Sequence, residues 1–305
     1  QRVDKFVTKA VPLLPQALLY KSIRTKRIKL NGKRCEISTR LCEGDRLSLY
    51  LNDEFFGGAP GAPAFLSVPP TVDVLYEDEN ILLADKRPGL LVHEDEGGQT
   101  DTLINRILHY LYQKGEYDPA RENSFTPALC NRIDRNTGGI VIAAKNAEAL
   151  RVLNEKIRER ELSKFYLCIC LGRPEPPKGR IECFLRKDSK TNTVRVYHHP
   201  VPDGRSAVTL YETLETRDRL SLVEVELLTG RTHQIRASFA DMGHPLLGDG
   251  KYGVGSVNRR YGEAQQALYS YRLRFDFPTD AGILNYLRGR EFIADEVPFR
   301  RKYFG

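Results

Sequence analysis

The sequence predicts an α+β protein with two domains: a small N-terminal α/β domain, and a larger one built on a large mixed or antiparallel sheet. Two observations support this prediction. Apolar and alternating strand patterns recur through residues 71–305 without a regular βα rhythm. Residues 57–70, rich in Gly and Pro, separate this part from a short basic segment. We therefore expect domains at residues 1–56 and 71–305, joined by a flexible linker at residues 57–70.

Residues 1–56 show the pattern of two helices followed by short strands. An apolar stripe over residues 6–10 predicts a first helix, and prolines end it. A second helix is expected over residues 16–25. Apolar residues then alternate with basic ones at 27–30, and Asn31-Gly32 follows, which is a strong hairpin signal. The alternation resumes at residues 47–51, which indicates a third strand.

Residues 71–305 contain clear strand patterns. Continuous apolar runs predict buried strands at residues 81–84, 140–144 and 165–171. Residues 223–227 and 271–277 alternate apolar with polar side chains, which is typical of half-exposed strands.

Two helices are predicted among these strands. Asn146 can cap the first, and Thr232 can cap the second, which Gly243 would end. Their core-facing positions are Leu150, Leu153 and Ile157 in the first helix and Ile235, Phe239 and Met242 in the second.

Composition excludes several classes of protein. The chain has 305 residues, of which 41% are hydrophobic and 29% charged, as in globular proteins. It contains no run of eighteen apolar residues and no signal-peptide pattern at its start, so we expect a cytoplasmic protein without a membrane span. The six cysteines form no Cys-x-x-Cys pair, and the histidines show no metal-ligand spacing. Free buried thiols are the expected state, and no metal site is predicted.

The positive charge is concentrated at the N-terminus. Residues 1–56 hold twelve Lys and Arg against six Asp and Glu, a net charge of +6 out of +7 for the whole chain. Such a segment favours a polyanionic partner, although a solvated basic face gives the same pattern. The candidate contacts to an RNA backbone are Lys21, Arg24, Lys26, Arg27, Lys33 and Arg34.

Asp134 is the candidate catalytic residue. It lies between Arg132 and Arg135, on a loop that leads into the apolar run at residues 140–144. Neighbouring cations keep a carboxylate ionised, as a charged nucleophile requires. If this segment stood alone, a structural ion pair would be the better interpretation.

Four further motifs change that judgement. The five segments are Asp85-Lys86-Arg87-Pro88-Gly89 with His93, Asn131-Arg132-Ile133-Asp134-Arg135-Asn136-Thr137-Gly138-Gly139, Lys164-Phe165-Tyr166-Leu167, Thr229 to Arg236, and Gly243 to Asp249. Together, over about residues 71–277, they resemble the RluA-type family of pseudouridine synthases. The resemblance implies a long bent sheet with an active-site cleft across its middle. It also implies isomerisation of uridine within RNA, without a metal or organic cofactor.

The resemblance assigns a role to each site residue. Asp134 matches the catalytic aspartate, acting on either the base or the sugar, and Arg231 matches the arginine that pairs with it. Tyr166 matches a tyrosine that lies against the uracil and is suited to proton transfer. Arg132 matches an arginine that contacts RNA near the flipped nucleotide. Asn131 replaces the usual histidine, which puts the packing of this loop in question.

The N-terminal segment has a resemblance of its own. Residues 2–51 resemble the small RNA-binding domain of the S-four type, first recognised in a protein of the small ribosomal subunit. We therefore expect a monomeric pseudouridine synthase that acts on structured RNA, with large-subunit ribosomal RNA as the expected substrate. A transfer-RNA pseudouridine synthase and a non-catalytic RNA-binding or ribosome-assembly protein are the alternatives. A hydrolase using Asp134 with His233 lacks a paired acid or metal ligands.

Overall fold

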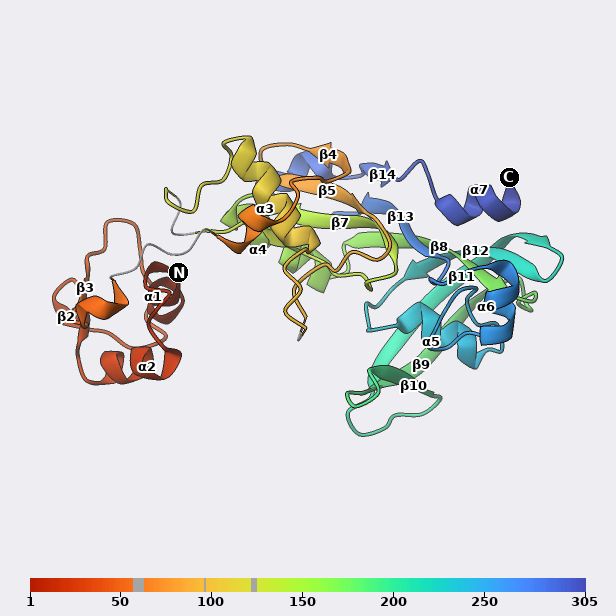
Figure 1. The fold of residues 1–305 in the computed structure, drawn as a ribbon, viewed down its shortest axis with the longest axis horizontal. Helices are drawn as coiled ribbons and strands as arrows, with labels where there is room; N and C mark the ends of the chain where they lie inside the picture. Colours follow the sequence, from red (N-terminus) through yellow and green to blue (C-terminus); the bar gives the residue numbers. More distant parts are fainter. Residues whose placement is uncertain (57–62, 96, 122–124) are drawn as a thin grey trace.

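The computed structural model describes residues 1–56, 63–95, 97–121 and 125–305. In these residues the strands form two separate sheets, one of three strands near the N-terminus and one of eleven strands in the remainder (Figure 1). The fold is therefore α+β, as predicted.

The N-terminal sheet is covered by two helices. The elements are α1 (Val3–Ala10), α2 (Gln16–Arg24), β1 (Ile28–Leu30), β2 (Lys33–Arg34), β3 (Leu47–Leu49) and the 3-10 helix η1 (Asp53–Phe55). The predicted helices, strands and hairpin are confirmed. Asn31 and Gly32 both have left-handed backbones, with φ of 51° and 75°. A tight turn between right-twisted strands requires this conformation, which Asn and Gly adopt most easily.

The predicted linker is partly wrong. Residues 57–62 lie outside the described part of the chain, but Ala64–Ser67 form the 3-10 helix η2. Phe65 is only 6% exposed, and its ring centroid lies 5.8 Å from that of Tyr117. Residues 64–68 are mostly apolar, so burying them against the second unit is more favourable than leaving them in solvent. This segment is therefore part of the larger unit.

The large sheet has the order β10-β9-β11-β12-β8-β13-β7-β5-β4, with β14 paired to β13 and β6 paired to β7. The strands at the β9 end run at an angle to those at the β5 end (Figure 1). The bounds are β4 (Val74–Glu77), β5 (Ile81–Lys86), β6 (Ala128–Leu129), β7 (Gly138–Ala144), β8 (Leu162–Leu171), β9 (Lys178–Asp188), β10 (Thr193–Tyr197), β11 (Arg205–Arg217), β12 (Leu220–Leu227), β13 (Leu268–Phe275) and β14 (Glu291–Ile293).

One parallel pair makes the sheet mixed. β13 runs parallel to β7 through Tyr269–Gly138 and Ser270–Gly139, whereas the other pairs are antiparallel. The two strands approach closely here. A Cβ on Gly139 would lie 2.2 Å from the carbonyl oxygen of Ser270, and one on Gly138 would lie 2.3 Å from the ring of Tyr269. Only glycine fits, and these two glycines fix the end of the loop that carries Asp134.

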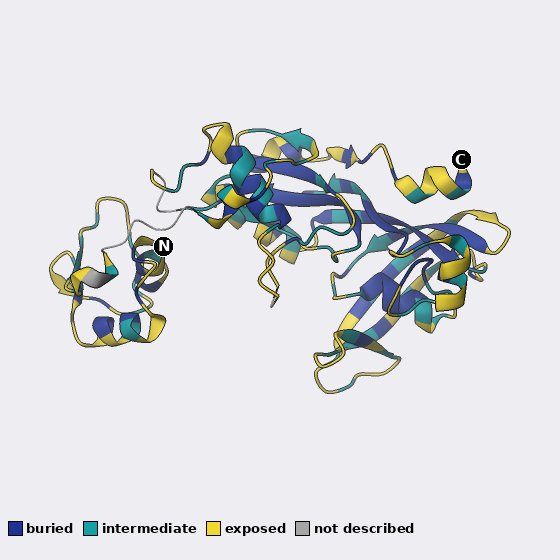
Figure 2. Ribbon diagram, in the orientation of Figure 1, coloured by how far each residue is buried: buried dark blue, intermediate teal, exposed yellow. Residues whose placement is uncertain are grey.

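The helices cover both faces of the sheet. They are α3 (Leu103–Gln113), α4 (Ala147–Arg158), α5 (Gln234–Asp241), α6 (Gly255–Tyr261), α7 (Pro298–Phe304) and the 3-10 helix η3 (Gly282–Leu287). Leu82 and Ala84 pack in the cluster with α3, while Ile81 and Leu83 pack in the cluster with α4. Burial on both faces explains why residues 81–84 of β5 and the whole of β7 are continuous apolar runs, shown dark blue in Figure 2.

Of the two predicted helix caps, one is confirmed and the other is wrong. The side-chain oxygen of Asn146 accepts a hydrogen bond from the backbone N–H of Ala149 at 2.8 Å, as expected. The prediction for Thr232 is wrong, because α5 begins one residue later and His233 occupies the cap position with φ of 52°. The side chain of Gln234 instead accepts the backbone N–H of Arg231 at 3.0 Å, which satisfies this turn without a threonine cap.

Two expectations concern the chain as a whole. Within the described ranges no helix is long and apolar enough to cross a membrane. All six cysteines are free, and four are buried, whereas Cys42 is exposed and Cys130 is half-buried.

Candidate active site

A cleft of about 1900 Å³ crosses the large sheet. Its walls come from the loop at residues 130–137, from β8, from the start of α5 and from the β9–β10 hairpin. Asp134, Tyr166, Arg132 and Arg231 all line it. The tertiary structure therefore brings the four predicted site residues of the larger unit into one cavity, large enough for an extruded nucleotide and its neighbours.

Asp134 faces the cleft from the loop between β6 and β7, and its side chain is 26% exposed. Its Oδ2 accepts a hydrogen bond from Nη1 of Arg236 at 2.7 Å. Nε2 of His233 lies 3.8 Å from the same oxygen. Among the described residues Oδ1 has no hydrogen-bond partner, so this oxygen remains available to a substrate in the cleft.

The predicted pairing of Asp134 with Arg231 is wrong. Nε of Arg231 donates to the backbone carbonyl of Ser206 at 3.1 Å instead. Arg231 precedes α5, whereas Arg236 lies within the helix. The left-handed backbone of His233 lies between the two arginines and changes the direction of the chain there. The helix therefore presents Arg236, and not Arg231, to the carboxylate.

Arg236 also binds a second carboxylate. It is 5% exposed, and its Nε and Nη2 donate to the two oxygens of Asp249 at 2.7 and 2.9 Å. Burial by itself would lower the pKa of Arg236, but Asp249 and Asp134 more than offset this and raise it. Burial would likewise raise the pKa of Asp249, and the hydrogen bonds from Arg236 and from backbone N–H groups lower it. The guanidinium is thus permanently charged and fixed between two acids.

Lys86 binds the backbone of the loop that carries Asp134. It is 1% exposed, and its ammonium donates to the carbonyls of Arg87, Leu90 and Arg135 at 2.8–3.0 Å. Burial lowers the pKa of Lys86 to about 7, against the attraction of Asp134. By joining the carbonyl next to Asp134 to the 87–90 turn, Lys86 fixes the backbone from which the carboxylate projects.

Tyr166 projects into the cleft from β8 and is 6% exposed. Burial raises the pKa of Tyr166 to about 12, a hydrogen bond with Ser270 opposes the shift, and the charge of Asp134 adds to it. The phenol therefore stays protonated across the physiological range. Lys164, two residues earlier on the same face of the strand, also lines the cleft, and burial lowers its pKa.

The arginines flanking Asp134 in sequence do not bind its carboxylate in the described part of the chain. Arg132 is exposed and has no hydrogen-bond or ion-pair partner in the described part of the chain. Nε of Arg135 donates to the carbonyl of Gly89 at 3.1 Å. The cation that binds the carboxylate of Asp134 is therefore Arg236, and not a neighbour in sequence. Asn131 serves the loop, since its side-chain oxygen accepts the backbone N–H of Ile142 at 2.8 Å.

Sequence reasoning missed Arg236, Asp249 and Lys86 as site residues. Each was inside a quoted motif, Arg236 and Asp249 at the end of theirs. The usable signal was a pair of opposite charges in largely apolar segments, because buried charges need partners. Across the described ranges, no group of three or more His, Cys, Asp or Glu side chains has the arrangement of a metal site.

Comparisons with known proteins identify the family of this chain. A family model of RNA pseudouridylate synthases matches residues 80–241. A Bacillus subtilis protein described as an uncharacterized RNA pseudouridine synthase is 32% identical, over 90% of this chain and 82% of its own length. The ribosomal large subunit pseudouridine synthase C of Rickettsia bellii is 30% identical, over 83% of this chain and 82% of its own.

A solved structure supports the fold. The human RNA pseudouridylate synthase domain containing 1 superposes with a TM-score of 0.58 and 22% identity, covering 74% of this chain and 84% of its own. The family model spans the loop of Asp134, the strand of Tyr166 and α5. The chain belongs to the RluA-type RNA pseudouridylate synthase family, and it is an enzyme that isomerises uridine to pseudouridine in RNA.

Proposed function

We propose that Asp134 is the catalytic group and that Arg236 binds and orients its carboxylate. The observation that carries this proposal is the 2.7 Å contact between Nη1 of Arg236 and Oδ2 of Asp134 inside the cleft. The guanidinium occupies one oxygen of the carboxylate, so that Oδ1 can approach the nucleotide as a nucleophile.

The reaction breaks the bond between the uracil N1 and the ribose C1′ and forms one from C5 to the same carbon. The hydrogen at C5 is released as a proton, and N1, which has lost its bond to the ribose, takes up a proton. Reaching a base in folded RNA requires its extrusion, which costs roughly a few kcal/mol. We assign to Arg132 a contact with RNA near the vacated position, because its guanidinium is exposed at the cleft.

Tyr166→Phe is expected to keep substrate binding and lose most turnover. The ring can still lie against the base, but the hydroxyl that carries the proton is absent, and general acid–base groups contribute about 10²–10⁴-fold. Tritium release from RNA containing 5-tritiated uridine measures turnover, and filter binding measures affinity. Turnover equal to that of the wild type would reduce Tyr166 to a packing role.

We propose large-subunit ribosomal RNA as the substrate. The name of the Rickettsia relative supports this choice, as does the basic N-terminal unit, which suits a large folded RNA. Pseudouridine mapping across cellular RNA, with and without the protein, tests it. Sites lost only from ribosomal RNA would support the proposal, and sites lost only from transfer RNA would contradict it.

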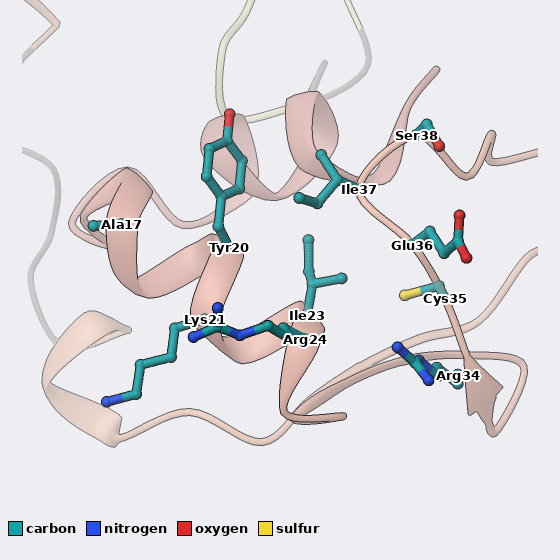
Figure 3. Close-up of a pocket in the computed structure, with 10 residues that line it drawn as sticks. All are labelled: Ala17, Tyr20, Lys21, Ile23, Arg24, Arg34, Cys35, Glu36, Ile37 and Ser38. Atoms are coloured by element: carbon teal, nitrogen blue, oxygen red, sulfur yellow. The ribbon is translucent and has the colours of Figure 1, made fainter.

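The N-terminal unit is proposed to bind RNA as an S-four-like domain. All six predicted contact residues are exposed. Three of them, Lys21, Arg24 and Arg34, line a cavity of about 510 Å³ between α2 and residues 34–38, with Tyr20 and Ile37 on its apolar side (Figure 3). Lys26, Arg27 and Lys33 do not line this cavity. The cavity has the size and charge to accept one nucleotide of a bound strand.

Replacing Lys21, Arg24 and Arg34 by Gln in one triple variant should weaken RNA binding. It should also make the RNA affinity less dependent on salt concentration. Each lost phosphate contact should reduce the log–log salt slope by about 0.9 on duplex or 0.7 on single strands. The matched triple variant at Lys26, Arg27 and Lys33 separates the cavity from general basicity. Binding isotherms at several salt concentrations decide. If the wild type and both triple variants gave the same salt slope, the basic residues would form only a solvated face.

Deletion of residues 1–56 should leave a folded catalytic unit with weaker RNA binding, because each unit has its own sheet and apolar cluster.

We propose a monomer, since Asp134, Arg236 and Tyr166 meet within one chain. The free thiols suit a reducing compartment such as the cytoplasm. Sedimentation of the full chain, as a single species of 34.7 kDa, tests the monomer.

A further inference from the structure

The β9–β10 hairpin is joined to Asp134 by two side chains. The backbone N–H of Val194, on β10, donates to the hydroxyl oxygen of Tyr252 at 2.7 Å. The same hydroxyl lies 2.8 Å from Nδ1 of His233, whose Nε2 lies 3.8 Å from Oδ2 of Asp134. This series of contacts runs from an edge strand of the sheet to the candidate catalytic carboxylate.

The direction of the hydrogen bonds in this series follows from its first donor, the backbone N–H of Val194. A backbone N–H can only donate, so the oxygen of Tyr252 is the acceptor for Val194. Among the described residues, Nδ1 of His233 is the one neighbour of this hydroxyl that can accept the phenolic hydrogen. A neutral imidazole that accepts at Nδ1 carries its hydrogen on Nε2, the nitrogen facing Asp134.

The surroundings favour the neutral imidazole. The side chain of His233 is 8% exposed. Burial lowers the pKa of His233 to about 4, although Asp134 opposes the shift, and the cations Arg236 and Lys251 contribute to it. Burial also raises the pKa of Tyr252, which keeps the phenol protonated as a donor.

Tyr252 is held in place by Asp249, the carboxylate that also binds Arg236. Oδ1 of Asp249 accepts the backbone N–H groups of Lys251 and Tyr252 at 2.8 and 3.1 Å. The guanidinium of Arg236 lies 5.3 Å from the centre of the Tyr252 ring. One short turn thus supports both side chains that approach Oδ2 of Asp134.

We propose that Tyr252 fixes His233 as the Nε2–H tautomer, making His233 a second positioning residue for Asp134 and coupling that carboxylate to the β9–β10 hairpin. The inference rests on the proposed catalytic role of Asp134. Lys187, Ser189 and Asn192 of the hairpin line the same cleft, and Nζ of Lys251 donates to the carbonyl of Asn192 at 2.6 Å. RNA that contacts the hairpin therefore acts on the orientation of Asp134 through Val194, Tyr252 and His233.

Nitrogen-15 NMR of histidine in the full-length protein tests the tautomer without reference to activity. His233→Gln identifies the resonances of His233 by their disappearance. We expect Nε2 to be protonated and Nδ1 to be an unprotonated acceptor, and we expect Tyr252→Phe to shift Nδ1 and populate the other tautomer. A protonated Nδ1 in the wild type, or an unchanged tautomer in Tyr252→Phe, would overturn the proposal.

Kinetics test the consequence for Asp134. Tyr252→Phe keeps the ring over Arg236 and removes only the hydroxyl, so we expect kcat for tritium release to fall about tenfold with KM for RNA unchanged. Tyr197→Phe is the matched control, because it removes a hydroxyl from β10 that pairs with Arg186, and it should leave kcat unchanged. An unaltered kcat in Tyr252→Phe, or an effect on KM alone, would contradict the positioning role.

Two replacements of His233 complete the test. Gln can present an N–H near the position of Nε2 and should retain most of kcat, whereas Asn, which tolerates the left-handed backbone but is too short, should not. Equal loss in both variants would assign His233 a purely structural role. If Asp134→Asn proved active, the proposed catalytic role would fail while the NMR result stood, so the two failures are distinguishable.

Discussion

Asp134→Asn is expected to abolish tritium release from RNA containing 5-tritiated uridine. The amide retains an oxygen that can accept from Arg236, so the loop and the ion-pair geometry should change little. The amide nitrogen cannot act as the charged nucleophile, and loss of such a group costs more than about 10³-fold in turnover. Melting temperature and RNA affinity should remain close to those of the wild type.

Asp85→Asn is the matched control for this substitution. Asp85 is also a half-buried acid of the catalytic unit, and its Oδ1 accepts the hydroxyl of Tyr269 at 2.6 Å, but it does not line the cleft. This variant should remain active. Appreciable tritium release by Asp134→Asn would show that another group performs the chemistry.

Arg236→Met is expected to abolish activity and to destabilise the protein strongly. Methionine preserves much of the side-chain volume but leaves Asp249, which is 1% exposed, without its cation. Breaking a buried ion pair from one side costs about 3–5 kcal/mol, because the remaining charge stays desolvated. Chemical denaturation of both proteins measures the loss, and tritium release measures the activity.

Arg231→Ala is the comparison that separates the two arginines of this motif. Arg231 is half-buried and donates to one backbone carbonyl, so its loss should change the free energy of unfolding by only about 1 kcal/mol. A large destabilisation by Arg231→Ala together with a stable Arg236→Met protein would show that the ion pairing of Asp134 differs from that described above.

Local patterns were sufficient to predict much of the fold. Alternation and apolar runs predicted β5, β7, β8, β12 and β13, because each strand is buried on one or both faces of the sheet. Asn146 predicted the start of α4, since a cap acts through atoms three residues apart. The Asn31-Gly32 turn predicted the hairpin of the N-terminal unit for a similar local reason.

Other elements depended on contacts that are distant in sequence. The edge strand β10 has only five residues, of which Val194 and Val196 are apolar, and pairing with β9 defines it as a strand. Residues 64–68 followed a Gly- and Pro-rich segment and were assigned to the linker, but Phe65 is buried beside Tyr112 and Tyr117. Burial of that ring depends on where α3 lies, which the composition of the segment does not contain.

The sequence by itself determined the α+β class, the basic N-terminal unit, and the presence of Asp134 and Tyr166 in a uridine-isomerising family. It assigned Arg231 as the partner of Asp134, which is wrong, because a motif that contains both Arg231 and Arg236 does not show which side chain faces the carboxylate. The tertiary structure decided this through the left-handed His233, the direction of α5 and the buried Asp249. A charge in a protein interior is governed by the groups that surround it in space, and these come from segments 13 and 102 residues apart in the chain.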